Sequence, residues 1–319
     1  IVSIQRSGAL SLDGAGAHVL SNGDDALAGL SANYGLLELE GDTAEGAGGA
    51  SLNVAASFAN HGQMRVDADD LAGGSGFSIG GALRNYGVIT LGNAHLAADD
   101  SLHAASLANQ GEIVIAGAAD NSAQARLSVA AAASANLVGV VSLSGAAVLA
   151  FDGGQIANVQ SGSALSLAGS GAQVTNGAGS ALLGLRNNYG ALAFQGEELD
   201  ATGGAQAEIV GAFVNAGALS VDSDGLSGGS HVVFDGLTPS IAAAALAAVA
   251  TSGVTIGNNS LSHDTRVEAA SLLNEGALTI QGSANDAVEA KLAIAGPARA
   301  ALTGEVTIAG DAALQYGGG

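Results

Sequence analysis

The chain has 319 residues, of which 48% are apolar and 3% aromatic, with 50 glycines and neither cysteine nor tryptophan. Its 29 acidic residues outnumber its 8 basic ones, which gives a formal net charge of −21 at pH 7. Nucleic acids and anionic membranes attract clustered lysines and arginines, so we expect no nucleic-acid partner and no membrane insertion, and the lack of cysteine excludes disulfides and thiolate metal sites.

A turn followed by alternating apolar residues recurs twelve times along the chain. The turns are spaced by 24 to 28 residues, with one gap of 35. Apolar residues at every second position indicate a strand with one buried face. The apolar pairs are, in chain order, Leu10/Leu12, Leu37/Leu39, Met64/Val66, Ile89/Leu91, Ile113/Ile115, Val141/Leu143, Leu165/Leu167, Leu192/Phe194, Leu219/Val221, Val254/Ile256, Leu278/Ile280 and Val306/Ile308.

Many of these turns contain the motif Asn-x-Gly. Asparagine and glycine tolerate left-handed backbone geometry well, so we expect them to form the sharp corner between two strands. Asparagines at successive corners would stack, and their amides would form a hydrogen-bonded ladder. Independent turn formers are the alternative. The predicted structural turn residues are Asn33, Gly35, Asn60, Gly62, Asn85, Gly87, Asn109, Gly111, Asn188, Gly190, Asn215, Gly217, Asn274 and Gly276.

A longer period lies over the short one. The tripeptide Asn-Tyr-Gly at 33–35 recurs at 188–190, an offset of 155 residues, and the offset becomes 165 after an insertion of about ten residues. We therefore expect two equivalent units of six coils, residues 1–155 and 156–319. The insertion contains Thr238 and Pro239 before an alanine-rich run, which predicts a short helix near 240–250; an irregular loop is the alternative.

A coil of about 26 residues holds three short strands and three turns. Such strands gain stability when each pairs in parallel with the coils above and below it, about 4.8 Å away. The sequence therefore predicts an all-β fold, a parallel β-helix (β-solenoid) of about twelve coils with three short strands per coil.

The Leu-x-Asn-x-Gly-x-Leu-x-Leu repeats resemble those of filamentous-haemagglutinin-type proteins. These are two-partner-secretion exoproteins and autotransporter passengers of Gram-negative bacteria. The resemblance covers nearly the whole chain and implies a right-handed parallel β-helix. It also implies a bacterial, extracellular or cell-surface location and a role in large adhesins or fibres.

The sequence shows little catalytic chemistry. Its arginines are scattered, whereas β-helical enzymes acting on acidic polysaccharides need carboxylates beside basic residues, so we expect no enzyme. Acidic turns can bind Ca²⁺, and the weak candidates are Asp67, Asp69, Asp222 and Asp224. The nonapeptide calcium motif is absent, because Ser78 stands where its aspartate is required. We expect no cofactor apart from weakly bound Ca²⁺.

The expected function is therefore structural, as a segment of a long secreted or cell-surface β-helical fibre or adhesin. Neither end has the polar cap usual in solenoids, so the expected partners are further copies of the repeat, in the same chain or stacked end to end. The alternative is a surface module that binds a host or bacterial receptor or glycan through the solenoid corners. A polysaccharide-active enzyme is the third possibility. Most acids should lie on the outer surface.

Overall fold

The structure of the protein is a computed structural model. It describes residues 1–41, 48–69, 73–120, 122–177, 179–197, 203–225, 228–235, 246–248, 252–284, 288–297 and 304–318. These residues form strands, turns and bends and no helix, so the predicted all-β parallel β-solenoid is confirmed. The coils number about eleven, close to the twelve predicted. Among the described residues there is no helix of the length and apolarity that a membrane crossing requires.

The chain divides into two compact units. The first comprises Ile1–Ala133, Gly139–Gly154 and Gly171–Gly179, and the second comprises Ser134–Val138, Gln155–Ser170 and Ser180–Gly319. The two sets of segments alternate between residues 134 and 180. The predicted boundary between residues 155 and 156 marks where the sequence repeat begins again, and it stays a prediction.

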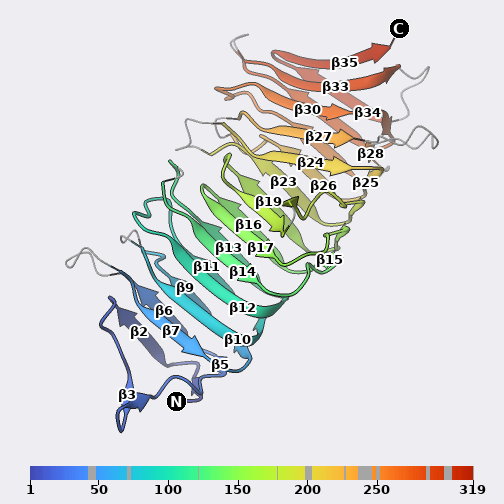
Figure 1. Cartoon of the computed structure of the whole chain (residues 1–319). Coiled ribbons are helices and arrows are strands. Elements are labelled where there is room, and N and C mark those ends of the chain that lie inside the picture. The colour runs from blue at the N-terminus through green and yellow to red at the C-terminus, as the bar shows by residue number, and fades with distance from the viewer. Residues whose placement is uncertain are drawn as a thin grey trace. The chain divides into compact units, whose positions relative to one another are not determined.

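The first unit consists of stacked coils whose strands form two parallel ladders (Figure 1). One ladder contains β2 (Ala9–Asp13), β6 (Leu36–Glu40), β9 (Gln63–Val66), β11 (Val88–Leu91), β13 (Glu112–Ala116) and β16 (Val140–Ser144). The other contains β1 (Ser3–Ile4), β5 (Ala32–Asn33), β8 (Phe58–Asn60), β10 (Gly76–Asn85), β12 (Asp100–Asn109), β14 (Ala125–Val129), β17 (Ala147–Phe151) and β20 (Gln173–Asn176), with β7 (Ser51–Val54) paired to β10.

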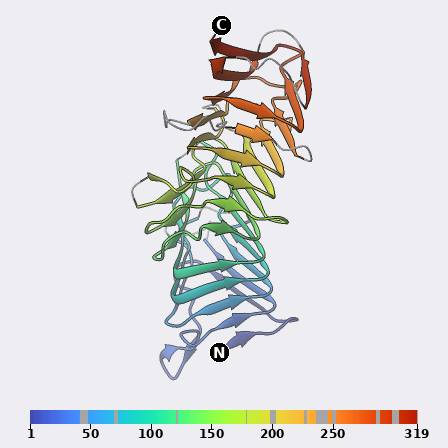
Figure 2. The same ribbon diagram turned by 90° about the vertical axis from the view of Figure 1, so that its right-hand side faces the viewer.

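The second unit has three parallel ladders, one for each face of its coils (Figure 2). The first contains β19 (Ala164–Ala168), β23 (Ala191–Gln195), β26 (Ala218–Val221), β29 (Gly253–Ile256), β32 (Ala277–Gln281) and β34 (Glu305–Ala309). The second contains β15 (Asn136–Leu137), β18 (Asn158–Val159), β22 (Asn187–Asn188), β25 (Phe213–Asn215), β28 (Leu246–Ala248) and β31 (Leu272–Asn274). The third contains β24 (Gln206–Val210), β27 (His231–Asp235), β30 (Thr265–Ala269), β33 (Ala290–Pro297) and β35 (Ala312–Gly318).

Two short strands lie outside these ladders. β3 (Leu20–Ser21) and β4 (Asp24–Asp25) form an antiparallel pair near the start of the first unit. β21 (Gly179–Ser180) belongs to the same sheet as β20.

The predicted apolar pairs are in register within each unit. In the first unit Leu39 pairs with Val66, Val66 with Leu91, and Leu91 with Ile115. Leu39, Leu91 and Ile115 are each 0% exposed, so they form one inward column. The second unit repeats the pattern, since Phe194 pairs with Val221 in the same way. Parallel in-register stacking therefore turns a two-residue alternation into a continuous apolar core.

The helix predicted near 240–250 is wrong where the structure describes it. Leu246–Ala248 is strand β28, which pairs in parallel with both β25 and β31. The backbone groups of this segment are satisfied by two neighbouring coils, and this pairing overrides the helical preference of its alanines and leucine. The rest of the predicted helix lies outside the described residues.

Candidate functional site

The asparagines of the first unit form the ladder that the sequence predicts. The Nδ2 atom of Asn33 donates to Oδ1 of Asn60 at 2.9 Å, Asn60 donates to Asn85 at 2.9 Å, and Asn85 donates to Asn109 at 2.8 Å. Each Nδ2 also donates to a backbone carbonyl of the next coil, such as that of Gln63 at 2.7 Å for Asn33. Because Asn33, Asn60 and Asn85 are 0% exposed, the ladder lies inside the solenoid corner.

The second unit has a shorter ladder of the same kind. Asn188 donates to Asn215 at 2.8 Å, and both are 0% exposed. In the next coil the paired residue is Ala248, which has no side-chain amide. Asn215 keeps its bond to the backbone carbonyl of the next coil, at Gly253, with a length of 3.0 Å, and it also donates to the carbonyl of Gly217 at 3.1 Å. The following residue in register is Asn274. The coil that contains the insertion thus lacks an asparagine at this position, and the ladder is interrupted there.

A second asparagine column was not expected from the sequence. The Nδ2 atom of Asn158 donates to Oδ1 of Asn136 at 2.8 Å, and Asn187 donates to Asn158 at 2.7 Å. These residues have no Asn-x-Gly motif in common, and they are separated by unequal spacings of 22 and 29 residues. An alignment of the coils on their apolar pairs would have placed these asparagines at equivalent positions.

The predicted reason for the corner glycines is wrong. The corner glycines Gly35, Gly62, Gly87, Gly111, Gly190 and Gly217 do not have positive φ, and the only described non-glycine residues with positive φ are Asn22, Asp67 and Asp222. A Cβ at Gly62 would overlap the carbonyl oxygen of Gly35 in the preceding coil, and the same overlap recurs at Gly87, Gly111 and Gly217. These glycines are required by the close approach of successive backbones, not by a left-handed conformation.

An aromatic column runs along the outside of the same corner in the first unit. The rings of Tyr34 and His61 are stacked with centroids 4.8 Å apart, and His61 stacks on Tyr86 at 4.7 Å. Tyr34 and Tyr86 are 39% and 44% exposed. In the second unit Tyr189 is exposed at the position equivalent to Tyr34, but Ala216 occupies the position of His61. The stacked column is therefore a feature of the first unit.

Two of the four calcium candidates accept hydrogen bonds from backbone amides at a corner of the coil. Asp67 and Asp222 are 0% exposed and have positive φ values of 46° and 51°. One carboxylate oxygen of Asp222 accepts from the amide of Gly196 at 2.6 Å, and the other accepts from the amide of Ser230 at 2.9 Å. Asp67 accepts from the equivalent amides of Gly41 and Ser75. Asp67 and Asp222, together with the buried Glu40 and Asp100, are exceptions to the expectation that most acids lie on the outer surface.

The carboxylates of Asp67 and Asp222 differ in the third residue that lies beside them. The hydroxyl of Thr265 donates to Asp222 at 2.6 Å, whereas the equivalent residue beside Asp67 is Asp100. Burial, followed by the hydrogen bond to Asp67 and the charge of Asp67, raises the pKa of Asp100 to about 9. Asp100 is therefore protonated at neutral pH and can donate to Asp67, as the threonine hydroxyl does in the second unit.

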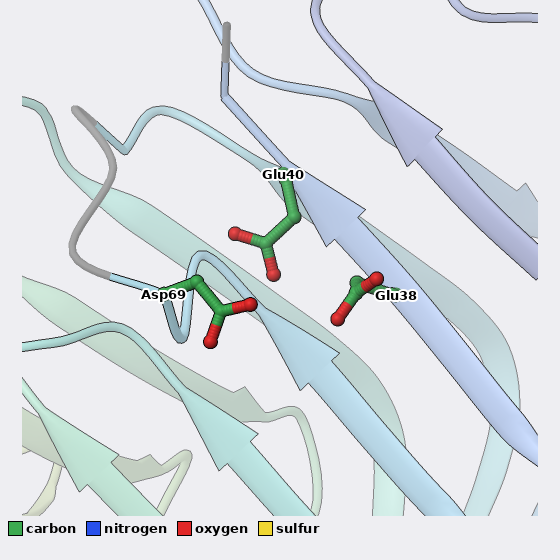
Figure 3. Close-up of side chains that lie close together, drawn as sticks. All are labelled: Glu38, Glu40 and Asp69. Atoms are coloured by element: carbon green, nitrogen blue, oxygen red, sulfur yellow. The ribbon is translucent and has the colours of Figure 1, made fainter. Parts of the chain in front are cut away.

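The other calcium candidate of the first unit, Asp69, belongs to a cluster of three carboxylates (Figure 3). Glu38 and Glu40 lie on β6, and Asp69 follows β9 in the next coil. One oxygen from each lies within 4.8 Å of the others, and among the described residues this is the one group with such metal-compatible spacing. Asp224, the equivalent of Asp69 in the second unit, is exposed.

Arg65 on β9 is the basic residue of this cluster. Its Nη1 atom lies 3.2 Å from Oε1 of Glu38, and its Nη2 atom contacts Oδ1 of Asp69. Glu40 is only 5% exposed, and neither of its oxygens has a hydrogen-bond partner within normal geometry. Burial, and then the charges of Asp67, Asp69 and Glu38, raise the pKa of Glu40 to about 7.

Comparison with protein-family models, with curated proteins and with solved structures gives no match for this chain. The class that the fold and the stacked corners define is that of parallel β-solenoid repeat proteins.

Proposed function

We propose that the chain is a structural segment of a long secreted or cell-surface β-helical fibre, of the bacterial filamentous-haemagglutinin type of adhesin. The observation that supports this most strongly is the stacking of like residues through successive coils. The Asn33–Asn109 ladder, the apolar column of Leu39 and its neighbours, and the corner glycines all make contacts along the stacking direction.

Contacts of this kind suit a protein that extends by adding coils. In a solenoid each coil contacts only its neighbours, so the stability of the array grows with each added interface. The expected partners are accordingly further copies of the repeat. The net charge of −21 favours repulsion between neighbouring fibres and keeps them apart. On this proposal the protein catalyses no reaction.

Micrographs of the native product that contains this chain test the proposal. We expect extended fibres that carry this segment, which an antibody against the chain would label along their length. Discrete globular particles that bind the antibody would contradict the fibre function.

The alternative, a binding module that uses the solenoid corners, is favoured by one observation. Tyr34, His61 and Tyr86 present an exposed column of aromatic edges and polar atoms, and partly exposed tyrosines are common in recognition surfaces. The chain should then bind a glycan or surface receptor, and Tyr86→Ala should weaken that binding while Tyr189→Ala leaves it unchanged. Equal binding by both variants, on a glycan array and on intact cells, would exclude the column.

A further inference from the structure

The buried position of Glu40 is occupied by a different residue in each unit. In the second unit its equivalent is Gln195, also 5% exposed. Gln195 accepts from the amide of Ser223 at 3.0 Å and donates to the hydroxyl of Ser220 at 3.3 Å. The neutral amide at this position thus forms hydrogen bonds through both its oxygen and its nitrogen. Glu40 instead places two buried oxygens there, and only the Ala68 amide, equivalent to that of Ser223, acts to lower its pKa.

The residues around Glu40 are also more highly charged in the first unit than their equivalents in the second. Glu38 and Arg65 in the first unit correspond to Ala193 and Ser220 in the second. The first unit therefore has two more carboxylates and one more guanidinium around the same corner. When all three carboxylates are ionised, they and the one arginine leave two negative charges there. Like charges beside the buried Glu40 are costly unless a counter-charge is present.

We propose that Glu38, Glu40 and Asp69 form a calcium-binding site in the first unit, with no counterpart in the second. Figure 3 shows the Glu40 carboxylate turned towards the other two. One oxygen from each carboxylate lies within 4.8 Å of the other two. Three oxygens at that limit would each be about 2.8 Å from a common centre, so a slight closure of the cluster brings all three into the 2.3–2.6 Å range of Ca²⁺–oxygen contacts.

The set of donors selects the ion. Arg65 uses one oxygen of Glu38 and one of Asp69, which leaves one oxygen on each and both oxygens of Glu40 for an ion. Water completes the six to eight oxygen ligands that Ca²⁺ takes in flexible geometry, whereas Mg²⁺ demands a tight octahedron. The carboxylates of Glu38, Glu40 and Asp69 come from two successive coils and together attract a divalent cation.

Isothermal titration of the full chain with CaCl2 at pH 8 tests the site. We expect one saturable site with a dissociation constant of about 0.1–1 mM, the range of extracellular calcium modules. MgCl2 should bind at least tenfold more weakly. Glu40→Gln, which introduces the residue found at position 195, and Glu38→Gln should each weaken calcium binding at least tenfold. Asp224→Asn, the matched control in the second unit, should leave it unchanged.

Circular dichroism of each variant checks that it is folded. Glu38 is partly exposed, so its substitution does not require the core to repack. The site is overturned if the wild-type chain shows no saturable calcium binding, or if both glutamate variants bind calcium as the wild type does. Equal loss in Asp224→Asn, or equal affinity for Mg²⁺, would also overturn it. These results leave the fibre function untouched, because that function is tested by fibre morphology.

Discussion

The Nδ2 atom of Asn60 lies 2.9 Å from Oδ1 of Asn85, one coil away, and both side chains are 0% exposed. Asn60 donates its other proton to the carbonyl of Val88 at 3.0 Å. Its Oδ1 accepts from Asn33 of the preceding coil, so one side chain bonds to the coils on both sides inside the corner. A buried amide with all its bonds made fixes the register of the coils, and one left unpaired is costly.

Substitution of Asn85 by alanine should therefore lower the free energy of unfolding by about 1–3 kcal/mol, because it leaves Asn60 without its acceptor. Denaturant unfolding followed by circular dichroism measures the change. Asn53→Ala is the control, since Asn53 is exposed on β7 and should change stability by less than about 0.5 kcal/mol. Equal effects of the two variants would show that the ladder contributes nothing.

The corner glycines give a sharper comparison. Gly62→Ala should destabilise the first unit strongly, because its Cβ would meet backbone atoms of Gly35 and Tyr34 that cannot move aside. A Cβ on Gly253 would meet nothing within 4 Å, and the register partners of Gly253 are Ala218 and Ala277. Gly253→Ala should be neutral or stabilise by up to about 1 kcal/mol. A tolerated Gly62→Ala in thermal unfolding would show that the coils are not this closely stacked.

The apolar core can be tested on one strand. Ile115 on β13 is 0% exposed, whereas Val114 beside it points outward. Ile115→Ala should cost about 2–5 kcal/mol of unfolding free energy, whereas Val114→Ala should cost much less. Reversal of this order in denaturant titrations would mean that the strand faces are exchanged.

The register of the apolar strands could be predicted from the sequence, but the reason for the corner glycines and the strand at Leu246–Ala248 could not. Leu91 and Ile115 belong to an alternation that recurs at every coil, so pattern alone identifies their column. The reason for Gly62 was missed because a sequence shows that glycine recurs but does not show how close two backbones lie. The strand at Leu246–Ala248 was missed because its partners in β25 and β31 outweigh local preference.

The acidic cluster was missed for a related reason. Glu40 and Asp69 are 29 residues apart and meet only when β6 and β9 stack in register. A signal was present in the sequence: at an offset of 155 residues Glu40 corresponds to Gln195. Comparison of equivalent coils shows where one unit carries extra charge, which a motif scan along the chain does not show.

Asp100 should make the stability of the first unit depend on pH. Its pKa is about 9 in the folded protein against an ordinary value of 3.8. The folded state therefore binds the proton more tightly, so this contribution to stability is fully present below about pH 4 and is lost as pH rises towards 9. The expected slope is a loss of about 1.4 kcal/mol per pH unit within that window.

Asp100→Thr, which introduces the residue found at position 265, should remove that slope and keep a hydroxyl donor for Asp67. Unfolding free energies measured between pH 5 and pH 9 for the wild type and the variant provide the comparison. Parallel pH profiles would show that Asp100 titrates normally in the folded protein.

Fibre diffraction from aligned native material tests the structural function most directly. We expect a meridional reflection at about 4.8 Å, because parallel strands of successive coils repeat at that distance along the stacking direction. Six coils per unit would add a longer axial period of about 29 Å. Aligned fibres with the 4.8 Å reflection on the equator, or native material that forms no fibre to align, would contradict the proposed function.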